Sequence, residues 1–231
     1  MYRKNIISVI ITNYNNSAYI DRAIRSIDNQ QISANSALTI ETVIVDDGSK
    51  DNPRLWLKKY KRIPNKKIIL LKKNRGVAYA SNIGIKKASG EFIIRVDADD
   101  FISPNLISLC NDTLLYNKKI SFVYTDLYQV DYYGNKIKFI KRNKMSSLLL
   151  YGAGCAIRKD AIKDVGYYNA KYKNCEDLDL MIRLINKNYK GVYFPLPYYN
   201  YFKMNKSLTS SRNRIKMLKY MENKWNLKLE E

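Results

Sequence analysis

Histidine is absent from this sequence of 231 residues, which removes imidazole from every catalytic or metal-binding scheme. Proton transfer must therefore fall to Asp, Glu, Lys or Tyr side chains. Cysteine is scarce as well: Cys110, Cys155 and Cys175 lie far apart in the sequence and form no paired metal-binding motif. An odd and sparse cysteine count is typical of a protein in a reducing compartment.

Long apolar runs are also missing from the sequence. No run approaches the ~18–20 residues of a membrane-spanning helix. The first four residues, Met-Tyr-Arg-Lys, lead directly into a strand-like segment, so no signal peptide is visible. The content of hydrophobic residues is 46%, which is enough to bury a core. We therefore expect a compact cytoplasmic protein.

Acidic residues are few beside basic ones, and the formal net charge is +20. A charge of this size permits binding to nucleic acid, to anionic lipid or to anionic substrates. An A/T-rich genome would produce the same excess, because Lys, Asn, Ile and Tyr all have A/T-rich codons. The composition leaves these explanations open.

Strand-like and helix-like patterns alternate through the first hundred residues. The expected strands cover residues 6–12, 39–45, 68–71 and 91–96, and the expected helices cover residues 19–27, 55–60 and 78–88. This alternation at short spacing predicts a mostly parallel sheet with right-handed crossovers.

The pattern changes after Pro104. We expect a helix over 105–116, a strand over 121–130, a hairpin turn at 132–135, a basic loop over 136–144, a short strand over 155–158, a helix over 177–186 and a last strand over 192–194. Pro195 and Pro197 follow that last strand and are expected to end it.

Three carboxylates follow the apolar run 92–94: Asp97, Asp99 and Asp100. They repel one another unless a cation lies among them, and a hard divalent cation with oxygen ligands is the usual partner. In open α/β sheets the carboxyl ends of strands are where ligands bind. The pattern therefore predicts a metal-assisted site for a phosphorylated substrate, with a solvated turn as the alternative.

Four segments, in this order, resemble motifs of the family 2 inverting glycosyltransferases. They are residues 8–15 (SVIITNYN), 45–49 (VDDGS), 97–100 (DADD) and 176–180 (EDLDL). The resemblance implies the GT-A fold, a Rossmann-like α/β nucleotide-diphospho-sugar transferase fold with a mixed, mostly parallel central sheet flanked by helices. It also implies transfer of a sugar from a nucleotide-sugar, with a UDP-sugar favoured, to an acceptor hydroxyl with inversion.

The resemblance assigns a set of residues to the nucleotide. They are Thr12, Tyr14, Asp46, Asp47, Arg75, Asn82 and Asp97. The ring of Tyr14 would stack on the nucleobase, and Asp47, with Asp46 next in preference, would accept the imino proton of uracil. The alternatives from the residues alone are core packing for Tyr14 and a turn-forming role for the two acids.

The metal and the catalytic base are assigned in the same way. The resemblance makes Asp99 a direct ligand of Mn²⁺ or Mg²⁺, with Asp97 as a second ligand or as a contact to ribose or metal-bound water. Asp100 either joins them or caps the following turn. Asp177, with Glu176 beside it, becomes the base for the acceptor hydroxyl, held as a carboxylate by a helix N-terminus. Its alternative is an ordinary N-terminal helix acid paired with Lys or Arg, such as Arg183 on the same helix.

Two departures from the family pattern affect the donor site. Ser81 stands where an Arg is usual, although Arg75 lies nearby in the sequence. Phe202 and Met204 stand where the family often has Arg and His, so Lys203 or Lys206 would have to neutralise the diphosphate.

The C-terminal segment shows a basic amphipathic pattern. Ile215, Leu218, Met221 and Trp225 share one helical face, and Lys and Arg residues surround them. Such a helix either packs on its own domain or lies on an anionic membrane surface. Membrane attachment would place the protein on the inner face of the cell membrane and suit a lipid-linked saccharide as acceptor.

We expect three parts: a nucleotide-sugar-binding half (residues 1–103), an acceptor-binding half of the same compact domain (104–210) and the basic amphipathic helix (211–231). The alternatives are an inactive relative, a sugar-phosphate nucleotidyltransferase and a nucleic-acid-binding protein. A nucleotidyltransferase would need a glycine-rich loop after the first strand, where the sequence reads TNYNN. Nucleic-acid binding leaves the clustered acids unexplained, so we expect no nucleic-acid partner.

Overall fold

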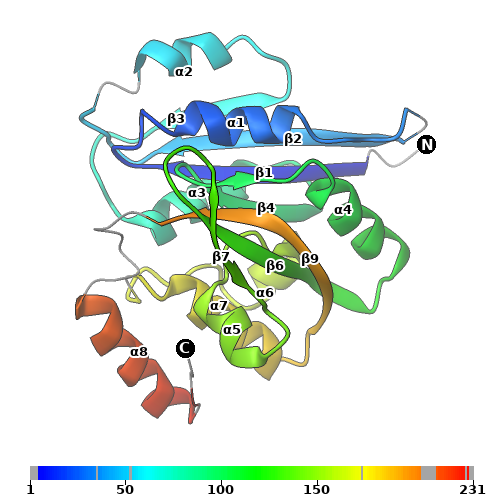
Figure 1. The fold of residues 1–231 in the computed structure, drawn as a ribbon, viewed down its shortest axis with the longest axis vertical. Coiled ribbons are helices and arrows are strands. Elements are labelled where there is room, and N and C mark those ends of the chain that lie inside the picture. The colour runs from blue at the N-terminus through cyan, green and yellow to red at the C-terminus, as the bar shows by residue number, and fades with distance from the viewer. Residues whose placement is uncertain are drawn as a thin grey trace.

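The protein forms one mixed sheet with helices packed on both faces, as seen in a computed structural model that describes residues 5–34, 36–51, 54–172, 174–203, 212–226 and 228 (Figure 1). The strands are β1 (Asn5–Asn13), β2 (Leu38–Asp46), β3 (Lys66–Leu70), β4 (Phe92–Asp97), β5 (Phe101–Ile102), β6 (Ile120–Val130), β7 (Lys136–Ile140), β8 (Ala156–Arg158) and β9 (Lys190–Phe202). The helices are α1 (Ile20–Asp28), α2 (Arg54–Tyr60), α3 (Val77–Lys87), α4 (Leu106–Tyr116), α5 (Met145–Leu150), α6 (Lys159–Asp164), α7 (Glu176–Asn186) and α8 (Arg212–Trp225).

The strand order is β3-β2-β1-β4-β8-β6-β9-β5. β7 lies off this path and pairs with the C-terminal end of β6, residues 127–130. The first four strands in this order are parallel, as the alternation predicts. The chain moves outward from β1 to β2 and β3, and then returns to place β4 on the other side of β1. This reversal is a topological switch point, and the carboxyl ends of β1 and β4 are where such a sheet binds ligands.

Alternate side chains of β1 enter two different cores, because successive residues of a strand point to opposite faces. Ile7, Val9 and Ile11 pack with the apolar face of α1, whereas Ile10 packs with α3 and α7. Gly84 lets α3 lie against β1, since a Cβ there would come within 2.4 Å of Ile10 Cγ2. The central strands are therefore buried on both sides and present only their ends to solvent.

Two expectations for the second half are wrong. Residues 136–140 form strand β7 rather than a loop, because they complete a hairpin with β6. The last strand does not end at Pro195 but continues as β9 to Phe202. Its pairing with β6 shifts register between Phe194 and Tyr199, which accommodates two prolines that cannot donate a ladder hydrogen bond.

Helix α8 packs on its own domain. Met221 is fully buried, and Leu218 and Trp225 lie against the core cluster that includes α7. Only Ile215 of the expected apolar stripe is exposed. In the described part of the chain, no helix is both long and apolar enough to cross a membrane.

A buried carboxylate on β2 joins three parts of the fold. Glu41 accepts hydrogen bonds from Ser8 Oγ at 2.5 Å and from Ser89 N at 2.7 Å, and it pairs with Lys67 Nζ at 2.6 Å. Burial would raise the pKa of Glu41, but these donors outweigh it and hold the pKa below the ordinary 4.5.

We predict that the stabilisation by Glu41 is fully present above the ordinary pKa of 4.5, and that it is lost as pH falls through its lowered pKa. Denaturant unfolding at neutral pH and near pH ~3 should show the loss. Glu41→Gln should lower the unfolding free energy at neutral pH by about 1–3 kcal/mol and flatten its acid dependence. The exposed Glu91→Gln is the matched control, and equal effects from both variants would contradict this role.

Candidate active site

Predicted site residues from three strands meet at one edge of the sheet. Asn13 is in register with Asp46, and Thr12 is in register with Asp97. Asn13 Nδ2 donates to Asp46 Oδ2 at 2.7 Å, and Thr12 Oγ1 donates to Asp97 Oδ1 at 3.3 Å. The carboxyl ends of β1, β2 and β4 therefore form one polar edge at the switch point.

The acids after β4 differ in their surroundings. Asp99 is half-buried, and desolvation together with the nearby charge of Asp97 raises its pKa to about 6. Asp100 is buried, and its carboxylate accepts hydrogen bonds from Tyr199 Oη at 2.6 Å and Phe202 N at 2.7 Å. The turn-capping interpretation of Asp100 is wrong, because this carboxylate fastens the motif to β9.

The pair Asp97 and Asp99 fits a divalent cation. Burial is the larger cause of the raised pKa of Asp99 and the charge of Asp97 is the second, and a cation bound by both carboxylates would offset their repulsion. Among the described residues, no group of three or more Asp, Glu or Cys side chains is placed to hold a metal ion. Two carboxylates still suffice for Mg²⁺, which usually keeps several waters and takes its other ligands from substrate phosphates.

A buried arginine lies at the centre of the acids. Arg95 on β4 is 6% exposed and contacts carboxylates from two elements: Asp97 at 3.3 Å, Glu176 at 3.1 Å and Asp177 at 2.6 Å. Burial works to lower the pKa of Arg95, but Asp177 and Asp97 raise it well above the usual range. Three carboxylates against one guanidinium leave an excess of negative charge at this edge.

Asp177 is the more accessible acid at the start of α7. Its side chain is 18% exposed, whereas that of Glu176 is 7% exposed. Gly152 approaches it so closely that a Cβ would come within 2.5 Å of Asp177 Cβ. The predicted alternative partner, Arg183, pairs instead with Asp179 at 2.6 Å. Arg183 is therefore not the partner of Asp177. The ion pair of Asp177 is with Arg95, so the alternative of a helix acid paired with an arginine is compatible with the structure.

Asp46 and Asp47 organise the loops around them. Asp46 accepts from Ser49 N at 3.0 Å, which is the turn-forming role left open by the sequence. Asp47 accepts from Arg75 N at 2.9 Å and Gly76 N at 2.7 Å, and so holds the loop that precedes α3. Desolvation raises the pKa of Asp47 despite these donors. Their contact with uracil stays a prediction.

The remaining predicted nucleotide residues divide into exposed and engaged side chains. Tyr14 is 42% exposed, so core packing is wrong for it and its ring is available for stacking. The guanidinium of Arg75 lies over the Tyr79 ring at 3.9 Å. Asn82 exchanges two hydrogen bonds with the backbone of Tyr168, at 2.8 and 3.0 Å, and so supports that loop. Nucleotide contacts by Arg75 and Asn82 stay predictions.

Of the residues at which this sequence departs from the family pattern, the structure describes Ser81 and Phe202 but not Met204. Ser81 is fully buried, and its Oγ has no hydrogen-bond partner in the described chain. Phe202 is buried, and its ring packs at a tilt of 42° against that of Tyr19, with 4.9 Å between the ring centroids. Lys203 is exposed, whereas Met204 and Lys206 lie outside the described residues.

Arg95 and Tyr199 contact the acids of the candidate site but are not among the residues predicted for it. A signal for Arg95 was present, because a single charge inside the otherwise apolar run 92–96 must find buried partners. Tyr199 offered no such signal, since it is one of 20 tyrosines and its role depends on how β9 returns to the sheet.

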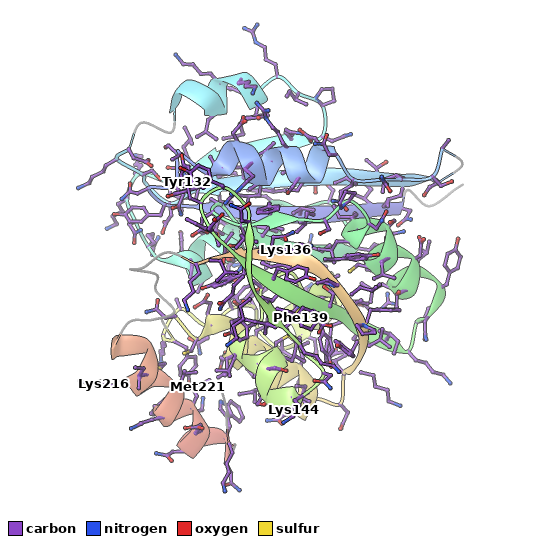
Figure 2. All side chains as sticks on the ribbon, in the orientation of Figure 1. Tyr132, Lys136, Phe139, Lys144, Lys216 and Met221 are labelled. Atoms are coloured by element: carbon purple, nitrogen blue, oxygen red, sulfur yellow. The ribbon has the colours of Figure 1, made fainter. Side chains whose placement is uncertain are left out.

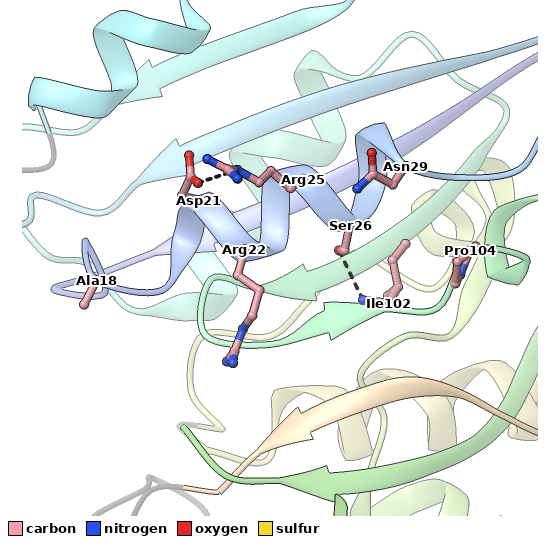
Figure 3. Close-up of a pocket in the computed structure, with 8 residues that line it drawn as sticks. All are labelled: Ala18, Asp21, Arg22, Arg25, Ser26, Asn29, Ile102 and Pro104. Carbon is pink, nitrogen blue, oxygen red and sulfur yellow. Dashed lines mark hydrogen bonds and ion pairs between the residues drawn. The ribbon is translucent and has the colours of Figure 1, made fainter. Parts of the chain in front are cut away.

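A separate hollow of about 540 Å³ lies between α1 and β5 (Figure 3). Its wall includes an Asp21–Arg25 ion pair of 2.6 Å and a hydrogen bond of 3.2 Å from Ile102 N to Ser26 Oγ. Arg22 also lines it, and Arg22 reaches away to the backbone oxygen of Asp99. The candidate site consists of the acids at the strand ends and not of this hollow.

A comparison with models of known families matches residues 8–166 to glycosyl transferase family 2. The chain belongs to this family. Chondroitin synthase of Escherichia coli is 30% identical over 189 residues, which cover 79% of this chain and 27% of that protein. A minor teichoic acid biosynthesis protein of Bacillus subtilis is 28% identical over 79% of this chain and 21% of its own length. This chain thus spans about a quarter of these curated relatives.

Solved structures show the same GT-A fold. S. aureus TarS residues 1–349 in complex with UDP-GlcNAc superposes with a TM-score of 0.73 at 22% identity, covering 97% of this chain and 68% of that one. GalNAc-T7 with UDP, GalNAc and Mn²⁺ gives 0.74 at 16% identity, covering 98% and 50%. The predicted family and fold class are confirmed.

We predict that Arg95→Met lowers the unfolding free energy by about 3–5 kcal/mol, because it leaves buried carboxylates without their cation. Denaturant titration measures the loss, and Arg95→Lys should recover part of it. The matched control is Arg25→Met, which breaks an ion pair whose Arg side chain is 64% exposed. That control should cost about 1 kcal/mol or less. A cost for Arg95→Met no greater than the control would contradict this view of the cluster.

Proposed function

We propose that this protein transfers a sugar from a nucleoside-diphosphate sugar, with a UDP-sugar favoured, to an acceptor hydroxyl with inversion. The observation that carries the proposal is the meeting of Asp97 and Asp177 on Arg95 at the switch-point edge, with Asp99 close enough to Asp97 to feel its charge. The proposed donor site and the proposed base would thereby lie side by side. Membership of glycosyl transferase family 2 supports this assignment.

The donor would lie along the ends of β1, β2 and β4. Tyr14 is exposed for stacking on a nucleobase, and Asp46 and Asp47 shape the loops beside it. We propose that Asp99 and Asp97 hold Mn²⁺ or Mg²⁺, which when bound would neutralise the diphosphate. GalNAc-T7, which shares the fold, was solved with UDP and Mn²⁺.

Asp177 is proposed to accept the proton of the acceptor hydroxyl. It lies in the first turn of α7, where the helix dipole favours a carboxylate. The ion pair with Arg95 fixes the side chain in place, and Gly152 leaves room beside it. A base held in this way takes the proton while the acceptor oxygen attacks the anomeric carbon from the face opposite the departing diphosphate, which inverts that carbon.

The acceptor is proposed to be a glycan or a lipid-linked saccharide in cell-surface polysaccharide assembly. The support is similarity to a chondroitin synthase and a teichoic acid biosynthesis protein. We also propose that the protein works in the cytoplasm at the inner face of the cell membrane, where a lipid-linked acceptor would be reached.

We predict that Asp99→Asn reduces metal-dependent affinity for UDP by at least about tenfold, because it removes one of two proposed ligand carboxylates. Calorimetry with Mn²⁺ and with EDTA measures the effect. The exposed Asp112→Asn on α4 is the matched control and should bind UDP like wild type. If wild type binds UDP equally well in EDTA, UDP binding does not depend on a metal ion and the proposed metal site is contradicted.

We predict that Asp177→Asn keeps UDP binding but lowers transfer by ~10²–10⁴-fold, since the base acts on the acceptor and not on the donor. Release of nucleoside diphosphate across a panel of donors and acceptors measures turnover. More than about a tenth of wild-type turnover would contradict the role, given the usual contribution of a base. Asp179 would not replace it, because Asp179 is buried and paired with Arg183.

A further inference from the structure

The hairpin of β6 and β7 exposes an unusual density of apolar side chains. Eleven large apolar side chains are exposed in the described chain, and five of them lie within residues 132–145: Tyr132, Tyr133, Ile137, Phe139 and Met145. β7 pairs with β6 and, within the described residues, has no strand on its other side. This edge is therefore open to a partner.

The same stretch is entirely free of acidic side chains. Residues 132–159 contain no Asp or Glu. Lys136, Lys138, Lys141 and Lys144 are exposed among the apolar residues. In Figure 2, Tyr132, Lys136, Phe139 and Lys144 succeed one another along the hairpin and the segment after it. We call residues 132–145 the hairpin surface.

Aromatic rings support the cations of this surface. The Phe139 ring lies 5.5 Å from that of Tyr128 on the paired strand. Lys136 Nζ lies 4.3 Å from the centroid of the Tyr128 ring. Amphipathic side chains of this kind place an apolar body and a charged tip at the level of lipid headgroups.

The hairpin tip is also tied to the candidate active site. Arg22 donates to the backbone oxygen of Tyr132 and to that of Asp99, each at 2.9 Å. A Cβ on Gly134 would lie 3.5 Å from the Phe101 ring, so the tip rests on the strand that follows the acids. A partner on the hairpin surface would thus lie next to the proposed donor site.

We propose that the hairpin surface docks this protein on an anionic lipid bilayer. The four exposed lysines are complementary to anionic headgroups. Exposed Ile and Phe side chains would bury little apolar surface against a purely polar polyanion, whereas they would bury apolar surface by entering the headgroup region of a bilayer. Lysines on an edge strand oppose pairing with a second copy of the same strand. The inference rests on the proposed membrane location and gives it a surface other than α8.

The first experiment measures binding to vesicles of phosphatidylcholine alone and of phosphatidylcholine mixed with phosphatidylglycerol. Wild type should bind the anionic vesicles more tightly, and salt should weaken the binding. The triple variant Ile137→Ser, Lys138→Ser, Lys141→Ser should bind about 25-fold more weakly from its two lysines alone. The matched control is Tyr116→Ser, Lys118→Ser, Lys119→Ser at the exposed end of α4 and in the turn that follows it, and this variant should bind like wild type.

The second experiment locates the contact. A Phe139→Trp reporter should show a blue shift of its indole emission on anionic vesicles, whereas a Tyr116→Trp reporter should not. Both proteins carry the same background of Trp56 and Trp225. Thermal unfolding and UDP binding of every variant, measured without lipid, separate docking from folding and from the donor site.

Several results would overturn the proposal. Equal loss of binding in both triple variants would show that anionic vesicles attract the basic protein as a whole and not the hairpin surface in particular. Lack of preference for anionic vesicles in wild type would remove the membrane partner. Unchanged binding by Ile137→Ser alone, with weaker binding by Lys138→Ser, would indicate an anionic polymer instead. A wild-type dimer dissociated by the triple variant would make the surface an interface between copies. Each result leaves the transfer reaction to be judged by its own assay.

Discussion

The candidate site depends on the ion pairs that the buried guanidinium of Arg95 makes with three carboxylates. Arg95 connects Asp97 at the end of β4 to Glu176 and Asp177 at the start of α7. These two elements are far apart in the sequence, and each brings acids that would repel those of the other. Without a shared cation the helix start and the strand end could not lie this close. One side chain thus holds the end of β4 and the start of α7 in contact.

The same logic of fastening recurs around the edge of the sheet. Asp47 holds the loop before α3, Asp100 holds β9, and Asn82 holds the backbone at Tyr168. Each of these side chains makes a hydrogen bond to a backbone group. Such a bond fixes a loop whatever side chain the loop residue carries. The acids at this edge therefore divide into those that hold backbone in place and those, Asp97, Asp99 and Asp177, to which we assign the proposed chemistry.

Part of the excess of basic residues surrounds an open edge strand, because residues 132–159 contain lysines and arginines but no acids. Helix α8, for which packing on the domain and a membrane contact were the two alternatives, uses Met221, Leu218 and Trp225 for packing. An amphipathic pattern in sequence specifies an apolar face, but whether protein or lipid covers that face depends on what lies beside it.

The sequence by itself determined the parallel half of the fold and most of the site. Runs such as residues 6–12 are β-branched and apolar, and they end in polar motifs whose order is specific to the family. Local patterns suffice there because strand, turn and helix each follow from neighbouring residues. Tertiary structure alone decided the partners of the charges. Asp177 pairs with Arg95 rather than Arg183, and Asp100 bonds to β9, because buried charges are satisfied by whatever the fold brings within reach.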